Sequence, residues 1–349
     1  MSDHLTVLHL AGSPVDEFHA ELSRVYAAGC FDAIADPSRF EFHIAYVCPG
    51  GTWKFPSDFD QASIDSAESM SLSQALIHLD SIDVDVMVPQ MFCIPGMTAY
   101  RGLFDVLRIP YVGNLPDLMA IAADKARTRA IVAAAGVPIP AGEILHVGEQ
   151  PVLATPVVVK PVAADNSMGV SLVRDPAELD AAVAEALRHG PAALVESYIE
   201  LGREVRCGII VRDGELIALP LEEYAVDETT HPIRGRDDKL SRNDDGDMYL
   251  VAKDSSKAWI VDESDPITQR VWDMARMCHA ALGARHYSLF DFRIDPQGNP
   301  WFLEAGLYCS YSPSSVVAVM AASTGIGVDD LFASALQELS SEGELSWRH

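Results

Sequence analysis

Basic residues are scarce in this chain of 349 residues: 25 lysines and arginines stand against 51 aspartates and glutamates, which gives a formal net charge of −26. Such a surface repels the phosphates of nucleic acids and the headgroups of anionic membranes, so we expect neither as a partner. A site that binds a polyphosphate must therefore gather its few cationic side chains locally, or recruit a divalent metal ion.

Long apolar stretches are also missing, and none approaches the roughly 20 residues that a transmembrane helix needs. The beginning, MSDHLTVLHLAG, lacks the basic leader and the apolar core of a signal peptide. The six cysteines are widely separated, which excludes a metal knuckle or a C-x-x-C redox pair. They are Cys30, Cys48, Cys93, Cys207, Cys278 and Cys309. We therefore expect a cytoplasmic protein with reduced and mostly buried thiols.

Apolar residues make up 49% of the chain and charged residues 22%, as in ordinary globular proteins, and the length predicts two or three domains. In the first third, short apolar runs alternate with helical patterns. The apolar runs cover residues 5–10, 42–47, 84–89 and 109–112, and the helical patterns cover residues 15–28, 72–79 and 99–107. This alternation predicts an α/β architecture, a doubly wound parallel sheet with helices on both faces. No G-x-G-x-x-G follows the first run, so a dinucleotide site is not predicted.

The remainder of the chain predicts an α+β architecture. Helices are expected at residues 116–135, 176–187, 266–282, 316–322 and 328–339, and strands at residues 155–160, 170–173, 193–198, 204–211, 216–220, 288–294 and 301–304. The sequences 213–214 and 295–299 are typical of the turns of β-hairpins. Residues 222–257 are polar and rich in turn formers, so we expect a long loop that becomes ordered on binding.

Two lysines occupy informative positions. Lys125 lies inside the expected long helix, whereas Lys160 ends a strand of valines. A lysine at the end of a buried strand needs a polar partner, although a single lysine more often extends its charge to solvent. The loop 163–169, which contains Ser167, follows Lys160 and offers the hydrogen-bond donors that a phosphate needs. Its residue types are also common turn formers, so the loop alone is weak support for a phosphate site.

Two glutamates stand at the ends of neighbouring expected strands. Glu196 lies near the end of one strand and Glu204 opens the next. Carboxylates accept hydrogen bonds from ribose hydroxyls or from an adenine amino group, so both could bind a nucleoside. The alternative is plain exposure to solvent at strand ends, which is the common fate of isolated glutamates.

Asp291 and Glu304 form the sharpest pair, because each lies in an expected strand that is otherwise apolar and aromatic. The turn between the strands makes them antiparallel neighbours, and two adjacent carboxylates repel each other unless a cation lies between them. Oxygen ligands of this kind suit magnesium that carries a nucleotide phosphate. Arg293 points to the same side of the strand as Asp291 and could neutralise an oxyanion, or could simply pair with Asp291. The alternative is a pair of solvated carboxylates on an edge hairpin.

Taken in order, these features resemble the ATP-grasp fold of the D-alanine–D-alanine ligase family between about residues 85 and 325. The matching stretches are residues 124–125, 136–140, 156–161, 166–170, 195–199, 202–204, 290–292 and 302–304. The resemblance implies an ATP-dependent C–N ligase with ATP and Mg²⁺ as cofactors. It also implies three units: a Rossmann-like pre-ATP-grasp domain at residues 1–120, a central subdomain at 121–200 and a C-terminal subdomain at 201–349.

The resemblance further implies roles for individual residues. Lys125 and Lys160 would contact the nucleotide phosphates, Glu196, Tyr198 and Ile199 would hold adenine above Leu303, and Glu204 would hold ribose. Asp291 and Glu304 would bind magnesium, and Arg293, Lys239 and Ser167 would assist catalysis, the last two from flaps that close over the phosphates. Phosphoryl transfer requires charge neutralisation and the exclusion of water, and closing flaps supply the second.

The acceptor half of the sequence departs from this family. Leu289 stands where D-alanine ligases have arginine, and we expect Arg293 to substitute for it. Gly306 stands where they have asparagine, which argues against a second fully coordinated metal ion. The segment 305–315 is bulkier and more aromatic than a dipeptide ligase requires. We therefore expect the nucleotide-binding residues to match those of the family, and the acceptor-binding residues to differ from them.

Longer stretches are most similar to one subgroup, the ligases of mycosporine-like amino acid biosynthesis. They are residues 36–47, 89–98, 204–210 and 302–310. This resemblance implies that an amino acid such as serine, threonine or glycine is joined to mycosporine-glycine, whose conjugated ketone oxygen is phosphorylated and then expelled by the amine. Tyr308, Tyr311, Ser314 and Ser315 would line the acceptor site, because aromatic faces pack flat conjugated rings. Residues 91, 92 and 97 could form the opposite wall or simply belong to the core.

Two other hypotheses remain open. One is an amino-acid ligase that makes a D-alanyl or related dipeptide, and the other is a nucleotide-binding regulatory or scaffold protein without turnover. For the ligase hypotheses the expected partners are small-molecule substrates, and the family resemblance implies a homodimer. Lys160, Lys239, Asp291 and Glu304, taken together, argue against a protein without turnover.

Overall fold

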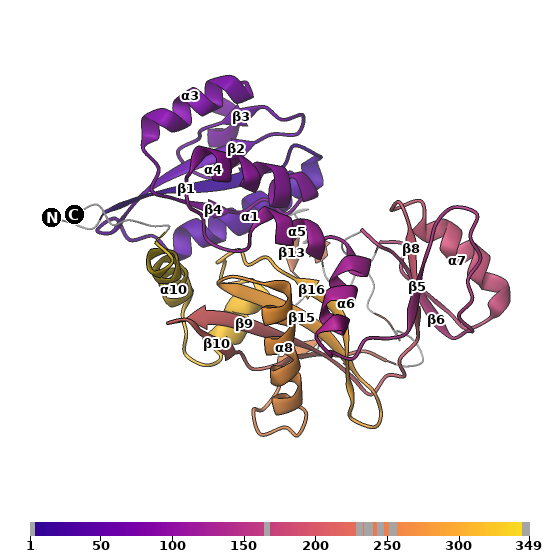
Figure 1. The fold of residues 1–349 in the computed structure, drawn as a ribbon. Coiled ribbons are helices and arrows are strands. Elements are labelled where there is room, and N and C mark those ends of the chain that lie inside the picture. The colour runs from indigo at the N-terminus through magenta and orange to yellow at the C-terminus, as the bar shows by residue number, and fades with distance from the viewer. Residues whose placement is uncertain are drawn as a thin grey trace.

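The computed structural model describes residues 4–163, 168–227, 233, 240–242, 248–250 and 257–343, with only the backbone described for 240–242 and 248–250. These residues form an N-terminal lobe, a small lobe built on the sheet β5-β8-β6-β7, and a lobe built on the larger sheet that contains β9, β15 and β16 (Figure 1). The relative positions of the three sheets decide where a ligand can lie.

The N-terminal sheet has the strand order β3-β2-β1-β4. Its strands are β1 (Leu5–Gly12), β2 (Phe40–Val47), β3 (Trp53–Lys54) and β4 (Val86–Pro89). β2, β1 and β4 are parallel, and β3 adds an antiparallel edge. The expected strand at 109–112 makes only one described bridge, between Met87 and Tyr111. The parallel sheet predicted from the sequence is thus confirmed with three strands in place of four.

Helices cover both faces of this sheet, because successive side chains of a strand point to opposite sides. Val7 packs with Cys30 of α1 (Glu17–Ala33), whereas Leu8 packs with Leu79 of α3 (Leu72–Ile82) and Phe104 of α4 (Arg101–Leu107). α2 (Gln61–Ser66) and a π-helical turn (Gly96–Tyr100) precede α3 and α4, respectively. The predicted doubly wound arrangement is therefore confirmed.

The expected helix at 116–135 is two helices, α5 (Pro116–Ala122) and α6 (Lys125–Ala134). Asp124 has extended backbone dihedrals, and its side chain accepts hydrogen bonds from the backbone N–H groups of Ala126 and Arg127. Aspartate is a favourable N-cap, so it starts a new helix inside a run of good helix formers. Lys125 is consequently the first residue of α6, and not the middle of a long helix.

The small lobe is an antiparallel sheet with the order β5-β8-β6-β7. Its strands are β5 (Gly142–Leu145), β6 (Val157–Pro161), β7 (Ser171–Val173) and β8 (Ala193–Ser197). A 3-10 turn (Pro176–Glu178) leads into α7 (Leu179–Ala186), which covers one face by packing Val183 against Val157 and Val195. The opposite face is left for the cleft described below.

The third lobe contains a larger antiparallel sheet with the order β14-β11-β9-β15-β16, and β10 pairs with β9. Its strands are β9 (Arg203–Arg212), β10 (Glu215–Ala218), β11 (Glu222–Tyr224), β14 (Ala258–Ile260), β15 (Tyr287–Ile294) and β16 (Pro300–Gly306). α8 (Thr268–Leu282) covers one face with Val271 and Cys278 against Phe290. Both predicted hairpins are confirmed, because β9 pairs with β10 and β15 pairs with β16.

The segment 222–257 differs from the single long loop expected for it. β11 adds a strand to the large sheet, and the short strands β12 (Leu240–Arg242) and β13 (Met248–Leu250) pair as a hairpin. β13 lies against α1 of the N-terminal lobe (Figure 1).

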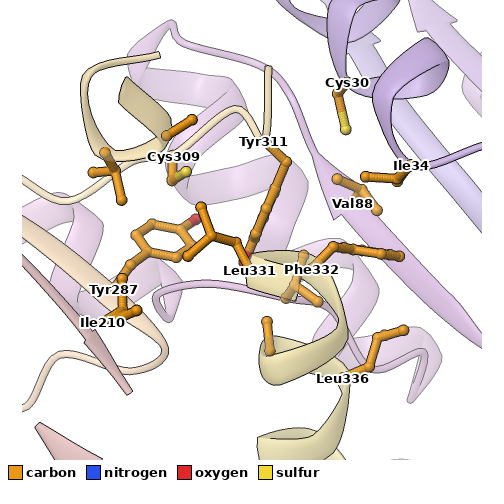
Figure 2. Packing of buried hydrophobic residues seen from close by; sticks show 14 of the residues in the cluster. Cys30, Ile34, Val88, Ile210, Tyr287, Cys309, Tyr311, Leu331, Phe332 and Leu336 are labelled. Atoms are coloured by element: carbon orange, nitrogen blue, oxygen red, sulfur yellow. The ribbon is translucent and has the colours of Figure 1, made fainter. Parts of the chain in front are cut away.

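A shared core joins the N-terminal lobe to the large sheet, and Figure 2 shows its centre. Cys30 of α1 and Val88 of β4 face Phe332 of α10 (Val328–Ser341), while Tyr287 of β15 and Tyr311 fill the middle. α9 (Val316–Ala322) contributes Val317 and Met320 to the same cluster. These contacts fix the N-terminal lobe relative to β9 and β15.

The six cysteines are free, and all except Cys48 are buried, as predicted. No helix among the described residues is both long and apolar enough to cross a membrane.

Candidate active site

A cleft lies between the small lobe and the large sheet. Its walls come from β6 and β8 on one side, from β9, β15 and β16 on the other, and from the start of α6. The residues predicted for the nucleotide and the metal ion all line it, and so does Arg293, which was predicted to assist catalysis. The nucleotide and metal residues are Lys125, Lys160, Glu196, Tyr198, Ile199, Glu204, Asp291, Leu303 and Glu304. The structure therefore brings together residues that the sequence spreads over 180 positions, from 125 to 304.

Glu196 and Lys160 form an ion pair across neighbouring strands of the small lobe. Lys160 Nζ lies 2.5 Å from Glu196 Oε2, and Arg129 of α6 places its Nε 3.1 Å from Glu196 Oε1. Glu196 is 4% exposed and Lys160 8% exposed, so neither extends to bulk solvent. Buried charges are stable only when paired, and the pairing rules out the solvent-directed lysine that was the alternative.

Glu204 and Arg293 form a second buried pair on the facing sheet. Arg293 Nη2 donates to Glu204 Oε2 at 2.8 Å, and Nη1 donates to the carbonyl oxygen of Ile199 at 3.2 Å. The guanidinium also lies over the Tyr198 ring, with Cζ 5.4 Å from its centroid. Arg293 therefore belongs to the end of the cleft that is lined by Tyr198 and Ile199, and the alternative that it pairs with Asp291 is wrong.

Leu303 lines the same end of the cleft, because successive side chains of a strand point to opposite faces of the sheet. Phe302 points into the core with Phe290 and Phe292, so its neighbour Leu303 points to the opposite side. Tyr198 is held by its backbone N–H, which donates to the carbonyl oxygen of Pro156 at 3.0 Å. An apolar side chain and a backbone segment thus face each other across a gap that suits a flat ring.

Asp291 and Glu304 lie opposite each other in the register of β15 and β16, at a β-bulge that follows Asp291. Each carboxylate has its own cation. Arg206 Nε lies 2.5 Å from Asp291 Oδ1, and Lys125 Nζ lies 2.9 Å from Glu304 Oε1. The repulsion between the carboxylates is therefore relieved by an arginine and a lysine, where the sequence predicted a bridging metal ion alone.

The pair also fits magnesium, since both carboxylates line the cleft and supply hard oxygen ligands. Among the described residues, no three histidine, cysteine, aspartate or glutamate side chains converge on one point. A magnesium ion here would therefore complete its coordination with phosphate oxygens and water, as is usual for metal ions that accompany nucleotides.

Two residues of the site were missed from the sequence, Arg129 and Arg206. Arg206 lies two residues after Glu204 on β9, so it shares the cleft-facing side, and it stands opposite Asp291 in the pairing of β9 with β15. The alternation along β9 could have revealed it. Arg129 lies on α6 behind Glu196, and no local pattern in the sequence marks it.

The two tyrosines predicted to line the acceptor site lie in different environments, one exposed and one buried. Tyr308 is 46% exposed and places its ring 5.7 Å from that of Phe92, which lies 5.2 Å from the ring of Tyr26 on α1. Tyr311 is only 2% exposed and packs edge-on against Tyr287 and Phe332 in the core (Figure 2). The prediction that Tyr311 lines the acceptor site is not supported by this position.

Ser314 and Ser315 have local structural partners. Ser315 is the N-cap of α9 and accepts a hydrogen bond from the backbone N–H of Ala318, and Ser314 Oγ lies 2.9 Å from Ser312 Oγ. Met91 and Met97 are buried core residues, as the alternative for them stated. Ser167 and Lys239 fall outside the described residues, so their predicted roles stay predictions.

A family model described as "D-ala D-ala ligase C-terminus" matches residues 143–337, which is more than half of the chain. Among curated relatives, a D-alanine–D-alanine ligase of Citrifermentans bemidjiense is 30% identical over 244 residues, which cover 69% of this chain and 73% of that protein. The D-alanine–D-alanine ligase of Mycobacterium tuberculosis is 31% identical over 270 residues, which cover 74% of this chain and 70% of the relative.

Solved structures of similar fold cover nearly the whole chain. The VanG D-Ala:D-Ser ligase of Enterococcus faecalis aligns with a TM-score of 0.74 at 21% identity, over 96% of this chain and 99% of that one. The D-alanine–D-alanine ligase of Bacillus anthracis complexed with ATP aligns with a TM-score of 0.70 at 19% identity, over 97% and 100% of the two chains. These similarities confirm the predicted ATP-grasp fold.

Proposed function

This chain belongs to the D-alanine–D-alanine ligase family of ATP-dependent C–N ligases, and from that premise we propose how its cleft works. ATP and Mg²⁺ would bind between the two sheets, and the terminal phosphoryl group would pass to an oxygen of a small acceptor. An amine would then attack the activated carbon, so that a C–N bond forms, the C–O bond breaks, and ADP and phosphate are released. The observation that carries this proposal is the set of paired lysines and carboxylates that converge on one cleft.

The side chains of the cleft suggest how the nucleotide lies. Tyr198, Ile199 and Leu303 would enclose the base, and Glu204 would accept hydrogen bonds from ribose hydroxyls. Lys160 and Lys125 would lie along the phosphates. Each ammonium group is already fixed by a carboxylate, so it need not be reorganised when the phosphates bind.

Asp291 and Glu304 would hold the magnesium ion, which supplies charge neutralisation to the phosphate oxygens. Ser167 and Lys239 are proposed to close over the phosphates, as the sequence resemblance implies. Exclusion of water by such flaps protects a phosphorylated intermediate from hydrolysis. The acidic sequence supports the further proposal that the protein acts on small molecules in the cytoplasm, without nucleic acid or membrane as a partner. A homodimer is proposed only on the family resemblance.

For the acceptor, the relatives favour an amino acid. The curated relatives and the matched family model carry the names of D-alanine–D-alanine ligases. The first candidate reaction is therefore the phosphorylation of an amino-acid carboxylate, followed by attack of a second amino acid to give a D-alanyl or related dipeptide. An amino-acid acceptor fits the relatives and the matched family model better than a ring acceptor does.

The ring acceptor remains a second candidate because of a specific observation at the other end of the cleft. Leu289 and Gly306 replace the arginine and asparagine that the resemblance leads one to expect, and an exposed Tyr308 ring lies beside Phe92. Aromatic faces of this kind suit a flat conjugated ring. The candidate reaction is the coupling of an amino acid to mycosporine-glycine through its phosphorylated ketone oxygen.

One experiment separates these proposals. Purified protein is incubated with ATP and Mg²⁺ and with either a panel of D- and L-amino acids, or mycosporine-glycine together with the same amino acids. Release of ADP with a dipeptide supports the first candidate, and release of ADP with a red-shifted ultraviolet absorber supports the second. No acceptor-dependent ADP from any mixture would contradict the proposed ligase reaction and favour a nucleotide-binding protein without turnover.

A further inference from the structure

Arg206 lies beside Asp291, which lines the cleft, and near Tyr26 of the N-terminal lobe. It projects from β9 toward β15, where its Nε and Nη2 hold the two oxygens of Asp291 at 2.5 and 3.3 Å. Its Cζ lies 5.1 Å from the centre of the Tyr224 ring. The side chain is 14% exposed, so it is largely enclosed and still reaches open space. Burial acts to lower the pKa of Arg206, but Asp291, Tyr224 and Glu222 together outweigh burial and raise that pKa, so the side chain stays charged.

One nitrogen of this guanidinium is uncommitted. Arg206 Nη1 makes no hydrogen bond with any residue that the structure describes, whereas the other two nitrogens are committed to Asp291. An arginine presents its donors as a rigid fork, so the orientation that fixes Asp291 also fixes the direction of Nη1. The group is thus a preoriented anion-binding donor beside a predicted ligand of magnesium.

Tyr26 of α1 lies close to Arg206. Its ring is partly exposed, and its hydroxyl donates to no described residue. Burial of that hydroxyl raises the pKa of Tyr26, with nearby Tyr308 adding to the rise and Arg206 opposing it. Since Phe92 contacts both the Tyr26 and the Tyr308 rings, and Arg206 lies near Tyr26, one cation and three aromatic rings form a cluster beside Asp291.

These side chains come from four separate parts of the chain: α1, the segment after β4, strand β9 and the segment after β16. The backbone of β13 lies against α1 nearby. The carboxyl end of a parallel strand, here β4, is where α/β sheets commonly bind ligands. The cluster therefore lies next to Asp291, which lines the cleft, and close to the carboxyl end of β4.

We propose that Arg206 is a specificity-determining residue of this enzyme, whose Nη1, with the Tyr26 hydroxyl beside it, binds an anionic oxygen of the acceptor next to Asp291. This inference rests on the proposed ligase function and names the acceptor class as a small molecule that carries a carboxylate, or a conjugated ketone oxygen with partial negative charge. As that oxygen forms its bond to phosphorus, the bond from phosphorus to the leaving oxygen of ADP breaks. Arg206 stays protonated throughout and contributes charge stabilisation only.

The test compares Arg206→Lys with Arg203→Lys. Lysine keeps a positive charge opposite Asp291 but lacks the fork, so a purely structural pairing tolerates the change and a role in binding an anion does not. Arg203 is the matched control, because it lies on the same strand and holds Glu223 and Asp265 with the same fork, but on the face of β9 opposite to Glu204 and Arg206. Acceptor kinetics are measured as ADP release with whichever of the two acceptor classes the wild-type protein converts, and nucleotide affinity is measured by calorimetry with Mg·ADP.

We expect kcat/KM for the acceptor to fall about 100-fold in Arg206→Lys, the magnitude typical of one lost oxyanion donor, with Mg·ADP affinity within about threefold of wild type. Arg203→Lys should stay within about threefold in both measurements. Wild-type acceptor kinetics in Arg206→Lys, or a loss that merely follows weaker Mg·ADP binding, would overturn the inference.

Tyr26→Phe provides a second test that leaves the Arg206–Asp291 pair intact, so it remains informative if Arg206→Lys folds poorly. We expect a fall of roughly tenfold in kcat/KM for the acceptor, as is typical for a lost hydrogen bond to a charged group. An unchanged value in this variant would overturn the role of the hydroxyl. Failure of the proposed function appears in the wild-type protein alone, as the absence of acceptor-dependent ADP, and it removes this inference with it.

Discussion

The two ends of the cleft are built in different ways. The end proposed for the nucleotide is made of strands that are close in the two sheets, and its carboxylates are each paired with a nearby cation, as in Glu196 with Lys160 and Glu204 with Arg293. The region proposed for the acceptor, next to Asp291, is assembled from α1, the segments after β4 and β16, and β9. One end depends on strand alternation and pairing, and the other depends on how the N-terminal lobe docks.

This difference bears on what can change in evolution and in the laboratory. At the nucleotide end, each charged side chain satisfies a buried partner, so its replacement disturbs both the pair and the ligand. At the acceptor end, Tyr308 is half exposed and Tyr26 makes no hydrogen bond with described residues, so substitutions there should alter selectivity with little effect on stability.

The largest effect is expected at the nucleotide end, for Lys160→Ala. Loss of the ammonium group beside the phosphates should lower ADP release on the order of 1000-fold, because preorganised charge is the main source of catalysis in phosphoryl transfer. Glu196 keeps Arg129 as a partner, so the fold should persist. Circular dichroism during thermal unfolding provides the control, and an unfolded variant would show that Lys160 is structural.

A smaller but distinct effect is expected for Asp291→Asn at the boundary between the two ends. An amide is a weaker ligand for magnesium than a carboxylate, so the midpoint of a magnesium titration of ADP release should rise at least roughly tenfold. Asp273→Asn, at an exposed position on α8, is the matched control and should leave the titration unchanged. The same midpoint in both variants would remove Asp291 from the metal site.

At the acceptor end, Tyr308→Ala should act on the acceptor alone. We expect its KM to rise about tenfold, which corresponds to the loss of one aromatic contact, and the KM for ATP to stay unchanged. Tyr308→Phe keeps the ring and should behave like the wild type. If KM for ATP rises in parallel, then the two ends are not independent and the contrast drawn above is wrong.

The smallest effect is expected at His286, which links the N-terminal lobe to the start of β15 through Gly113. Burial lowers the pKa of His286 to about 3, and its Nδ1 accepts the backbone N–H of Gly113 at 2.7 Å. Because the folded-state pKa lies below the usual value near 6.5, His286 takes up a proton in the unfolded state but stays neutral in the folded state as the pH falls from about 6.5 toward 3. The folded protein therefore loses stability over this range.

His286→Asn keeps a neutral acceptor and tolerates the left-handed backbone at this position, where φ is 52°. Between pH 6.5 and 5 its free energy of unfolding, measured with urea, should fall less steeply than that of the wild type by about 1.4 kcal/mol per pH unit. Parallel pH profiles for the two proteins would show that His286 does not titrate on unfolding.

The contrast between the ends also explains what the sequence could predict. The nucleotide residues lie in short patterns, such as a lysine that ends a valine strand or an acidic pair in an aromatic hairpin, so the fold and this end follow from alternation and turn chemistry. Arg206 was missed, although it lies two residues after Glu204 on β9 and so points to the same side. The arginine expected at position 289 is absent, and Arg293, on the same strand as Asp291, was predicted to replace it.

Other errors have tertiary causes. Tyr311 lies in a segment that resembles a substrate loop, but docking of α10 buries its ring against Phe332. The break between α5 and α6 depends on the Asp124 cap, which competes with a run of helix-forming residues and is decided by local hydrogen bonds. The approach of Tyr26 to Tyr308 across 282 positions has no signature in any local pattern.

The central claim is that an oxygen of the acceptor is phosphorylated and then leaves with the phosphate. The most direct measurement supplies acceptor that carries ¹⁸O at that oxygen and determines the mass of the inorganic phosphate released with the coupled product. The account predicts one ¹⁸O atom in each phosphate molecule formed. Phosphate without label, in a reaction that still yields ADP and the C–N product, would contradict it.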